Sequence, residues 1–328
     1  MTGKHGVARL IPSDSVSGIY SVSLGLFLFS VQDVIIKSFS DRYSVLQIVF
    51  TRSVTALLIM LTVILATKNG TSFKVHNLWP IIFKGTCGFL SYLCYYMALT
   101  GLPLADAATI TFSAPIMVTA LSAILFRESV GWRRWCAVLI GFVAITMVVG
   151  PKGYFNNLSV VLALTAAFTY AISTISTRYI DARDSAITAA FYSMATFLAW
   201  SILVSALVLV FFEGNEEGPV QLAFLLRRWT NPTEIDQWMM VLLGFIAAGG
   251  FYLLVKAYMV AEFSAVAPFE YLYIVWGALF GFVLWRELPS IWTIFGITLL
   301  IGSNFYILRR EMALRARTAY RRPKIPHR

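Results

Sequence analysis

The sequence predicts an all-α integral membrane protein of about ten transmembrane helices, arranged as two inverted repeats of five helices. Three observations indicate this fold class. Apolar residues make up 59% of the 328 positions and charged residues only 13%, whereas about 25% of residues are charged in soluble domains. The apolar residues form ten runs, most with the roughly 20 residues that cross a bilayer. The second half of the chain also aligns with the first.

Short polar segments separate the apolar runs. The first five runs cover about residues 18–37, 44–66, 79–100, 104–126 and 132–150, and the second five cover about 158–178, 186–212, 237–259, 263–285 and 290–308. These runs form two five-helix units, 18–150 and 158–308, between an N-terminal tail (1–17) and a basic C-terminal tail (309–328). The one long connection, 213–236, contains an apolar stretch from Val220 to Trp229, for which a short interfacial helix and an irregular loop both stay open.

The positions of lysine and arginine predict the orientation in the membrane. With the N-terminus inside, seventeen of these residues lie in internal loops and tails, and six lie on the external side. Cytoplasmic segments carry the excess of positive charge in membrane proteins, so we expect both termini in the cytoplasm and the connection 213–236 outside. The basic tail from Arg309 to Arg328 directly follows a span. We therefore interpret it as a contact for anionic lipid and expect no nucleic-acid partner.

Residues that commonly hold metals or cofactors form no recognisable set. Cys87, Cys94 and Cys136 all fall within apolar runs, where cysteine behaves as a small hydrophobe. The sequence has no nucleotide-binding loop of the form GxxxxGK[ST], which disfavours direct hydrolysis of ATP. We therefore expect no cofactor and no metal, and coupling to protons stays open.

An internal alignment relates the two halves of the chain. A shift of 159 positions brings Phe126-Arg127-Glu128 onto Trp285-Arg286-Glu287 and Gly85 onto Gly244. Because five is an odd number, the second unit enters the membrane from the opposite side, which places Arg127 inside and Arg286 outside. Inverted repeats of this kind are typical of secondary transporters that work by alternating access. A duplicated membrane protein without a transport role stays open as the alternative.

These features resemble the EamA-type carriers of the drug/metabolite transporter (DMT) superfamily. The resemblance covers about Gly18 to Leu308. It rests on the ten-helix arrangement, on the Arg-Glu pairs that close the fourth and ninth helices, and on Ala257-Tyr258 followed by Ala265-Val266-Ala267-Pro268. The chain is most similar to the branch with bacterial S-adenosylmethionine carriers, through Asp33-Val34-Ile35-Ile36-Lys37, Arg52 and Lys256-Ala257.

The resemblance implies a multi-pass protein of the bacterial cytoplasmic membrane, with a central cavity lined largely by the third, fourth, eighth and ninth helices. Members of the family carry amino acids, nucleosides, vitamins and other metabolites, so the resemblance assigns no single solute. The chain departs from the S-adenosylmethionine branch at Glu270, where that branch has a basic residue. We expect a monomer or a homodimer.

Charged residues within the spans are the first candidates for function, because each costs about 2.5–3.5 kcal/mol on insertion scales. Asp33 and Lys37 are four residues apart and share a helix face, and Arg52 lies about eight residues into the next helix. We expect these three residues to form one charge cluster in the outer half of the membrane. A salt-bridge network that locks the first two helices and a role in gating or binding both stay open.

A second candidate pair lies in the other half of the chain. Lys256 is near the inner end of the eighth helix and Glu270 is about seven residues into the ninth, so an ion pair across that hairpin is geometrically feasible. The alternative is that Glu270 binds a cationic group of the solute or takes up a proton. Lys84 and Asp106 are expected to matter less, because both are placed near helix ends and solvent.

Aromatic residues of the same helices supply surfaces on which a planar or cationic solute can stack. The candidates for solute binding, besides Glu270 and Lys256, are Tyr95, Phe112, Tyr271 and Trp276. A lipid-facing or interfacial position is the alternative for each aromatic residue.

The sequence therefore predicts a secondary transporter for a small zwitterionic or cationic metabolite, such as an amino acid, a nucleoside or a compound like S-adenosylmethionine. Its expected partners are that solute and the membrane lipids. An integral membrane enzyme that acts on lipid and a non-transporting membrane subunit are the alternatives. An enzyme is disfavoured because the three histidines, His5, His76 and His327, lie in the tails or a loop and supply no convergent catalytic set.

Overall fold

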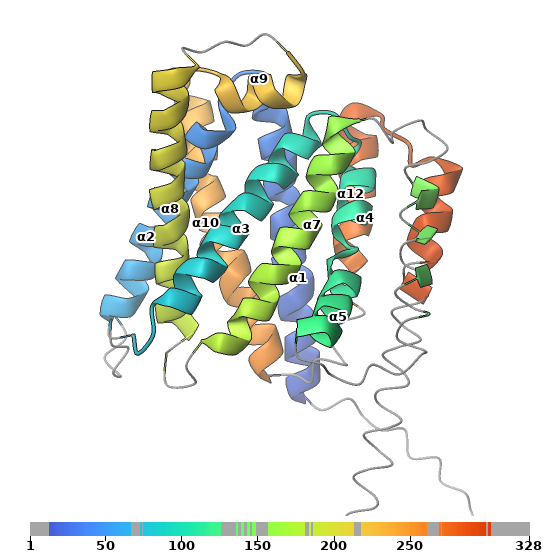
Figure 1. Cartoon of the computed structure of the whole chain (residues 1–328), viewed down its shortest axis with the longest axis horizontal. Helices are drawn as coiled ribbons and strands as arrows, with labels where there is room; N and C mark the ends of the chain where they lie inside the picture. Colours follow the sequence, from blue (N-terminus) through green and yellow to red (C-terminus); the bar gives the residue numbers. More distant parts are fainter. Residues whose placement is uncertain are drawn as a thin grey trace, which may run out of the picture.

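The computed structural model describes residues 13–66, 73, 75–125, 136, 139–140, 143–144, 146–148, 157–180, 184, 186–212, 218–260, 269, 271–299 and 301–302. These residues form helices and their connections, with no strand among them. In chain order the helices are α1 (Ser13–Phe39), α2 (Val45–Ala66), α3 (Trp79–Leu99), α4 (Leu104–Thr111), α5 (Ala114–Leu125), α7 (Leu158–Ser176), η3 (Thr177–Tyr179), α8 (Ala186–Phe211), α9 (Val220–Leu226), α10 (Glu234–Val260) and α12 (Leu272–Trp285) (Figure 1). Residues 291–299 are helical as well.

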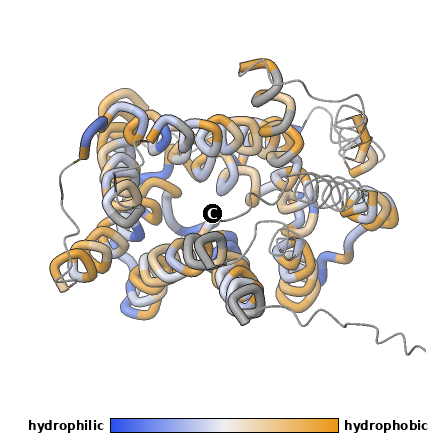
Figure 2. The backbone as a smooth tube through the Cα atoms, turned by 90° about the horizontal axis from the view of Figure 1, so that it is seen from below, coloured by the Kyte–Doolittle hydropathy of each residue, from blue (hydrophilic) through white to orange (hydrophobic). Residues whose placement is uncertain are grey.

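Five helices, α1, α2, α7, α8 and α10, are long and apolar enough to cross a membrane. Large apolar side chains are exposed on their outer faces, including Leu203, Leu207 and Val210 of α8. Figure 2, in which many helices are seen nearly end-on, shows hydrophobic colour along most of the tube. Exposed apolar surface of this extent marks contact with another apolar phase. The predicted all-α, multi-pass membrane fold is confirmed for the described residues, while the count of ten helices stays a prediction.

The helices of the two predicted units exchange partners. α3, the third helix of the first unit, packs against α7 and α8, whereas α10, the third helix of the second unit, packs against α1 and α2. α4 contacts α12 and α7, and α12 contacts α4 and α1. Each of these contacts has a counterpart in the other unit, which is the pattern expected of two halves related by a pseudo-two-fold axis.

Glycines allow two of these exchanged contacts to be close. A Cβ atom added to Gly85 of α3 would lie 2.8 Å from the Cβ of Thr196 on α8, and one added to Gly244 of α10 would lie 2.4 Å from the Cβ of Thr55 on α2. Both distances are too short for a real Cβ atom, so glycine permits these helix crossings. The internal alignment pairs the same two glycines.

The predicted span 104–126 is not one continuous helix. α4 ends at Thr111 and α5 begins at Ala114. Pro115 has no N–H group to donate to the Thr111 carbonyl, so the helical hydrogen bonding is interrupted there. The helix therefore breaks at Phe112 and Ser113, and the Ser113 carbonyl accepts the first hydrogen bonds of α5.

α9 lies across one end of the bundle, at the top of Figure 1, which we call the α9 end. Phe224 of α9 is fully buried. Beyond α9, the Gln47 side chain bonds to both backbone groups of Thr230 (2.7 and 3.2 Å), and Arg227 donates to the Ser40 carbonyl (2.8 Å). Of the two alternatives for the stretch from Val220 to Trp229, the short helix is present.

α5 and α12 end on opposite sides of the bundle. Glu287, just after α12, accepts a hydrogen bond from the N–H group of Leu104, the first residue of α4 (3.2 Å). From there α4 and α5 run away from the α9 end for about 30 Å, at 1.5 Å per residue, to Leu125 (Figure 1). This opposition agrees with an inverted second unit, although Arg127 itself lies outside the described residues.

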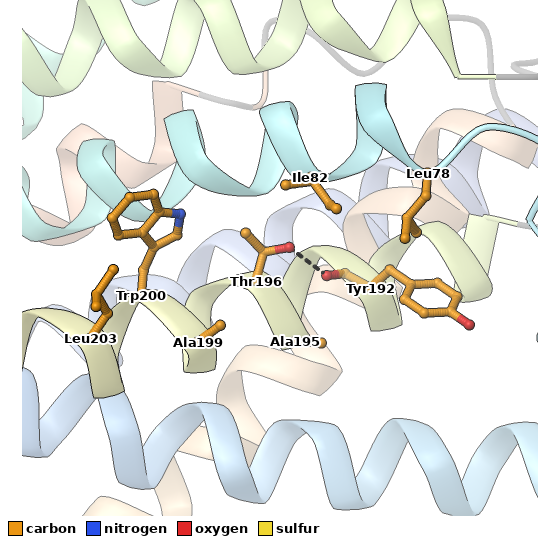
Figure 3. Close-up of a pocket in the computed structure, with 8 residues that line it drawn as sticks. All are labelled: Leu78, Ile82, Tyr192, Ala195, Thr196, Ala199, Trp200 and Leu203. Atoms are coloured by element: carbon orange, nitrogen blue, oxygen red, sulfur yellow. Dashed lines mark hydrogen bonds between the residues drawn. The ribbon is translucent and has the colours of Figure 1, made fainter.

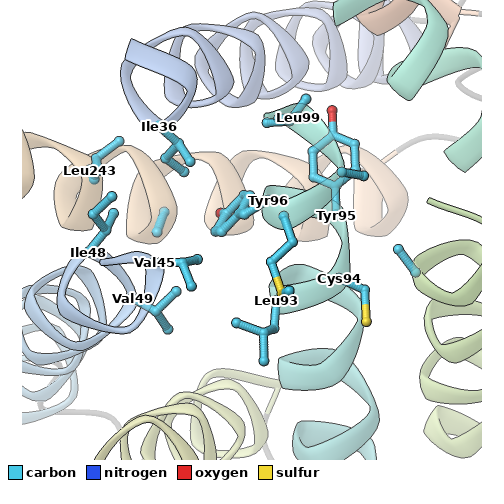
Figure 4. Packing of buried hydrophobic residues seen from close by; sticks show 14 of the residues in the cluster. Ile36, Val45, Ile48, Val49, Leu93, Cys94, Tyr95, Tyr96, Leu99 and Leu243 are labelled. Carbon is cyan, nitrogen blue, oxygen red and sulfur yellow. The ribbon is translucent and has the colours of Figure 1, made fainter. Parts of the chain in front are cut away.

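The largest apolar core cluster contains residues of α1, α2, α3, α4, α7, α8, α9 and α10, with Ile36 and Leu243 among its members (Figure 4). Tyr96, a fully buried side chain, belongs to it. Its hydroxyl group accepts hydrogen bonds from Gln32 (3.0 Å) and Arg52 (2.7 Å). The core therefore anchors the polar groups from which the candidate site is built.

Candidate functional site

A buried carboxylate lies where three helices meet. Asp33 of α1 is only 5% exposed. The hydroxyl group of Tyr95, from α3, donates to its Oδ2 (2.9 Å), and the hydroxyl group of Tyr273, from α12, donates to the same oxygen. The two phenol oxygens are 2.8 Å apart. Burial of a charged group is unfavourable unless it is hydrogen-bonded, so the two tyrosines stabilise Asp33 at this depth.

Asp33 lines a cavity of about 190 Å³, which we call the Asp33 chamber. Thr111, Phe112 and Ala114, at the break between α4 and α5, form part of its wall. Non-helical backbone at membrane depth is tolerated where it lines a cavity. The complete lining is Leu26, Phe29, Gln32, Asp33, Ser91, Tyr92, Tyr95, Thr111, Phe112, Ala114, Tyr170, Leu254 and Tyr273.

A second cavity, of about 160 Å³, adjoins the first. Phe29, Tyr92, Tyr170 and Leu254 line both. We call the second cavity the Arg52 chamber, because Arg52 of α2 lies in its wall. The helices that the family resemblance assigns to a central cavity, the third, fourth, eighth and ninth, all contribute to the two chambers, and so do α1, α2, α7 and α8.

Arg52 is buried, with 3% of its surface exposed, and its hydrogen-bond partner is uncharged. Its Nη1 donates to the Tyr96 hydroxyl group (2.7 Å), and its guanidinium carbon lies 4.8 Å from the ring centre of Tyr92. Its Nε makes no hydrogen bond with any described residue. Cation–π contacts compensate in part for the lost hydration, and the guanidinium keeps the capacity to bind an anion.

Lys84 of α3 also lines the Arg52 chamber. Its Nζ donates to the hydroxyl group of Thr177 (3.1 Å). The chamber wall described by the structure contains Arg52 and Lys84 and no acid, whereas the described wall of the Asp33 chamber contains one acid and neither lysine nor arginine. The two adjoining chambers therefore differ in the sign of their charge.

The expectation that Lys37 joins Asp33 and Arg52 in one cluster is not met. The Nζ of Lys37 lies 2.6 Å from Oε1 of Glu287 and 3.0 Å from the Leu102 carbonyl oxygen, at the α9 end. Lys37 is one helical turn beyond Asp33 on the same face of α1, but its partner comes from a position 250 residues further along the chain. Glu287 also binds the start of α4 and thereby connects α1, α4 and α12.

Asp106 is more buried than its place near a helix end predicted, whereas Lys84 is half-buried. Asp106 is fully buried, and its Oδ1 accepts a hydrogen bond from the Thr293 hydroxyl group (2.8 Å). The reason is that the helical segment 291–299 brings Thr293 against the first turn of α4. Lys84 extends along a chamber wall, as described above, in addition to lying near the end of a span.

The four aromatic candidates have different surroundings. Tyr95 and Phe112 line the Asp33 chamber. Tyr271 packs behind Phe112, with 5.9 Å between the ring centres. Trp276 packs against Phe27 of α1, with 5.1 Å between the ring centres, and is not among the residues that line the two chambers.

The pair Lys256 and Glu270 stays a prediction. Glu270 and the side chain of Lys256 lie outside the described part of the chain. α10, which carries Lys256, does contribute Leu254 to both chambers.

Several polar contributors were not among the predicted site residues. Gln32 and Tyr273 line the Asp33 chamber, and Glu287 holds Lys37. Gln32 had a sequence signal, because it is a polar residue next to Asp33 in an apolar run. Tyr273 was one of several tyrosines in the same run, and its contact with α1 spans 240 residues, so no local pattern identified it.

A third hollow, of about 360 Å³, lies between α3 and α8 (Figure 3). No charged residue lines it, and Leu78 and Leu203 at its rim are exposed. Its lining is Leu78, Ile82, Tyr192, Ala195, Thr196, Ala199, Trp200 and Leu203. We interpret it as part of the lipid-facing surface.

The site chemistry visible in the described segments is that of binding. Within these segments, no three His, Cys, Asp or Glu residues lie together as metal ligands would. The Asp33 chamber combines one carboxylate, hydroxyl groups and aromatic faces. That arrangement suits a solute with a cationic group.

Comparison with known proteins finds relatives over nearly the whole chain. The profile of the EamA-like transporter family matches residues 16–150 and again residues 157–309. An S-adenosylmethionine uptake transporter of Rickettsia bellii is 24% identical over 297 residues, which are 89% of this chain and 95% of the relative. A pseudopaline exporter of Pseudomonas aeruginosa is 26% identical over 297 residues, 90% of this chain and 97% of the relative. A crystal structure with 19% sequence identity has a TM-score of 0.60 and shares the fold over 91% of this chain and 97% of its own.

Proposed function

The chain belongs to the EamA-like transporter family, and from this premise we propose that it carries a zwitterionic or cationic metabolite across the bacterial cytoplasmic membrane by alternating access. The family confirms the resemblance inferred from the sequence motifs. It also supports the general class, a membrane transporter for a small organic solute, since the relatives carry transporter names. The proposal adds the chemistry of the solute, its binding site and the way in which the site opens.

The observation that carries the proposal is the buried Asp33 carboxylate in a chamber at a helix break. Ionisable residues inside a membrane usually face a cavity and mark the path of a solute or an ion. Tyr95 and Tyr273 both bond to Oδ2 of Asp33, so Oδ1 is the oxygen that we expect to meet a cationic group. Tyr92 and Phe112 supply aromatic faces in the same chamber, and such faces attract cations.

The names of the relatives support a charged solute and leave the direction open. One relative is an uptake transporter for S-adenosylmethionine and another is an exporter for pseudopaline. S-adenosylmethionine carries a sulfonium, an ammonium and a carboxylate group, so its charges suit a chamber that contains an acid. We therefore include it among the candidate solutes and assign no direction of transport.

The proposed alternating access uses the pair of Lys37 and Glu287 as a gate at the α9 end. This pair joins α1 to the end of α12, and Glu287 also binds the start of α4. Opening the chambers toward the α9 end requires these contacts to separate. The exchanged packing of the two units supports such a transition, because equivalent halves can swap their conformations around a central site.

With both termini in the cytoplasm, the α9 end faces outward, and the gate that is closed here is the external one. Glu270 and Lys256 remain proposed solute contacts. The basic tail after residue 308 is proposed to contact anionic lipid.

The experiment compares Asp33→Asn with wild type in proteoliposomes. The probes are S-adenosylmethionine, ornithine and lysine, each radiolabelled. The substitution keeps the shape of the side chain and removes its charge. A hydrogen bond to a charged group contributes about 1.5–3 kcal/mol, so we expect uptake of the transported probe to fall by about tenfold or more.

Asp106→Asn is the matched control. Asp106 is also a buried, hydrogen-bonded acid, but it is not among the residues that line either chamber. We expect its uptake to stay close to wild type. Equal uptake by wild type and Asp33→Asn would refute Asp33 as the site of solute binding.

A further inference from the structure

The Arg52 chamber contains hydrogen-bond donors that no described residue uses. The Nε of Arg52 and the hydroxyl group of Ser193 are buried, and neither has a partner among the described residues. Both side chains line this chamber. Lys84 lines it as well, and its recorded partner is the neutral hydroxyl group of Thr177. Buried polar groups in native proteins are normally hydrogen-bonded, so this set of donors indicates a ligand that accepts hydrogen bonds.

The Asp33 chamber has the complementary character. Asp33 contributes a carboxylate, and the Oε1 atom of Gln32 is buried there without a partner in the described structure. Gln32 is only 1% exposed, and its Nε2 donates to Tyr96. The free groups of this chamber are therefore acceptors, whereas those of the Arg52 chamber are donors.

The wall between the chambers is aromatic and aliphatic. Phe29, Tyr92 and Leu254 line both cavities. The Tyr92 ring lies directly against Arg52, with 4.8 Å between its centre and the guanidinium carbon. One ligand that reaches from Asp33 to Arg52 must therefore pass along an apolar surface, and a hydrocarbon or ring fits that surface.

We propose that the Arg52 chamber is a subsite for the anionic group of the solute, a carboxylate, while the cationic group of the same solute binds in the Asp33 chamber. The ligand is then a zwitterion that carries its opposite charges at different ends of an apolar or aromatic body. Arg52, Lys84 and Ser193 are the residues of the anion subsite. This inference rests on the proposed transport function and names the class of solute more closely.

The chemistry of the subsite makes it selective. Charged donors form short, strong hydrogen bonds with a carboxylate. A solute with a cationic group alone leaves Arg52 buried without an anion, and sites with polar groups left unpaired reject such analogues strongly. The subsite therefore favours zwitterions and rejects amines that lack the carboxylate.

The test measures dissociation constants of the purified full chain in detergent for three pairs of probes. Each pair contains a zwitterion and the same compound without its carboxylate: ornithine and putrescine, lysine and cadaverine, S-adenosylmethionine and its decarboxylated form. We expect at least one zwitterion to bind about tenfold or more tightly than its partner amine. Equal affinity within every pair, or no binding of any probe, would overturn the proposal.

Variants of the subsite distinguish a direct contact from a structural role. Lys84→Met keeps the length of the side chain and removes its charge, and Ser193→Ala removes one donor at little cost in volume. Both are expected to weaken binding of the zwitterion without weakening binding of the partner amine. Loss of both affinities by the same factor would indicate a structural role and contradict the subsite.

Arg42→Gln is the matched control, because Arg42 is an exposed cation that pairs with Asp236 outside both chambers. It is expected to keep the wild-type preference within each pair.

The experiments distinguish a failure of the anion subsite from a failure of the proposed transport function. If the amines bind as tightly as the zwitterions and are transported equally well in an Asp33-dependent manner, the anion subsite alone is overturned. If no probe is bound or transported, the proposed function is contradicted too.

Discussion

Asp33 shows how distant neighbours make a charge usable inside the membrane. Its two phenol donors come from α3 and α12, 62 and 240 residues away. The phenols lower the free-energy cost of burying the carboxylate but leave its charge in place. The charge of Lys37, in contrast, is neutralised by its ion pair with Glu287. A carboxylate held in this way keeps its attraction for a cationic solute.

Tyr273→Phe tests this arrangement. The substitution removes one of the two hydroxyl donors and keeps the ring, so Asp33 loses part of its stabilisation and its fixed orientation. We expect solute uptake in proteoliposomes to fall by about three- to tenfold, as the loss of a hydrogen bond of about 1 kcal/mol or slightly more predicts. Tyr252→Phe is the control, because Tyr252 is 63% exposed on α10. A Tyr273→Phe variant with wild-type uptake would argue against the role of Tyr273.

The sequence predicted which charged residues lie inside the protein better than it predicted their partners. The cost of charge in a span singled out Asp33 and Arg52, and both line chambers. The grouping with Lys37 did not hold, because helix spacing defines a shared face but says nothing about a partner such as Glu287, 250 residues away. Aromatic residues were harder still, since a tyrosine in an apolar run fits a chamber, a helix contact or lipid equally well.

Among the elements, the break between α4 and α5 has the most direct relation to the proposed function. It places Thr111, Phe112 and Ala114 in the wall of the Asp33 chamber. A continuous helix would present a different surface to the chamber, and its backbone hydrogen bonds would continue without a break at Pro115. A proline within the predicted span 104–126 indicates a bend, but its position in the sequence does not show that two separate helices result.

Pro115→Ala tests the need for the break. Alanine restores the N–H group and favours helix, so we expect α4 and α5 to approach one continuous helix. Uptake should then fall by about tenfold or more, while the unfolding temperature stays equal or rises. Pro80→Ala is the control, because Pro80 lies in the first turn of α3, where no helical hydrogen bond is lost. Full transport activity in Pro115→Ala would show that the break is dispensable.

For the molecule as a whole, the membrane class and five of the spans were predictable because lipid imposes a narrow range of lengths and compositions on each helix. The exchange of partners between α3 and α10 was not predictable in detail. It depends on small residues such as Gly85 and Gly244 at the crossings, which the alignment paired without indicating their neighbours. The two-fold arrangement nevertheless supports the proposed alternating access, since equivalent halves can exchange their conformations around the chambers.

Side-specific labelling of the chamber tests alternating access most directly. Thr111→Cys would be introduced into a chain from which Cys87, Cys94 and Cys136 have been removed, and a membrane-impermeant maleimide would be applied to each side of oriented vesicles. Our account predicts labelling from both sides, with the ratio of the two rates shifted by the transported solute. Labelling from one side only, with and without the solute, would contradict alternating access through the Asp33 chamber.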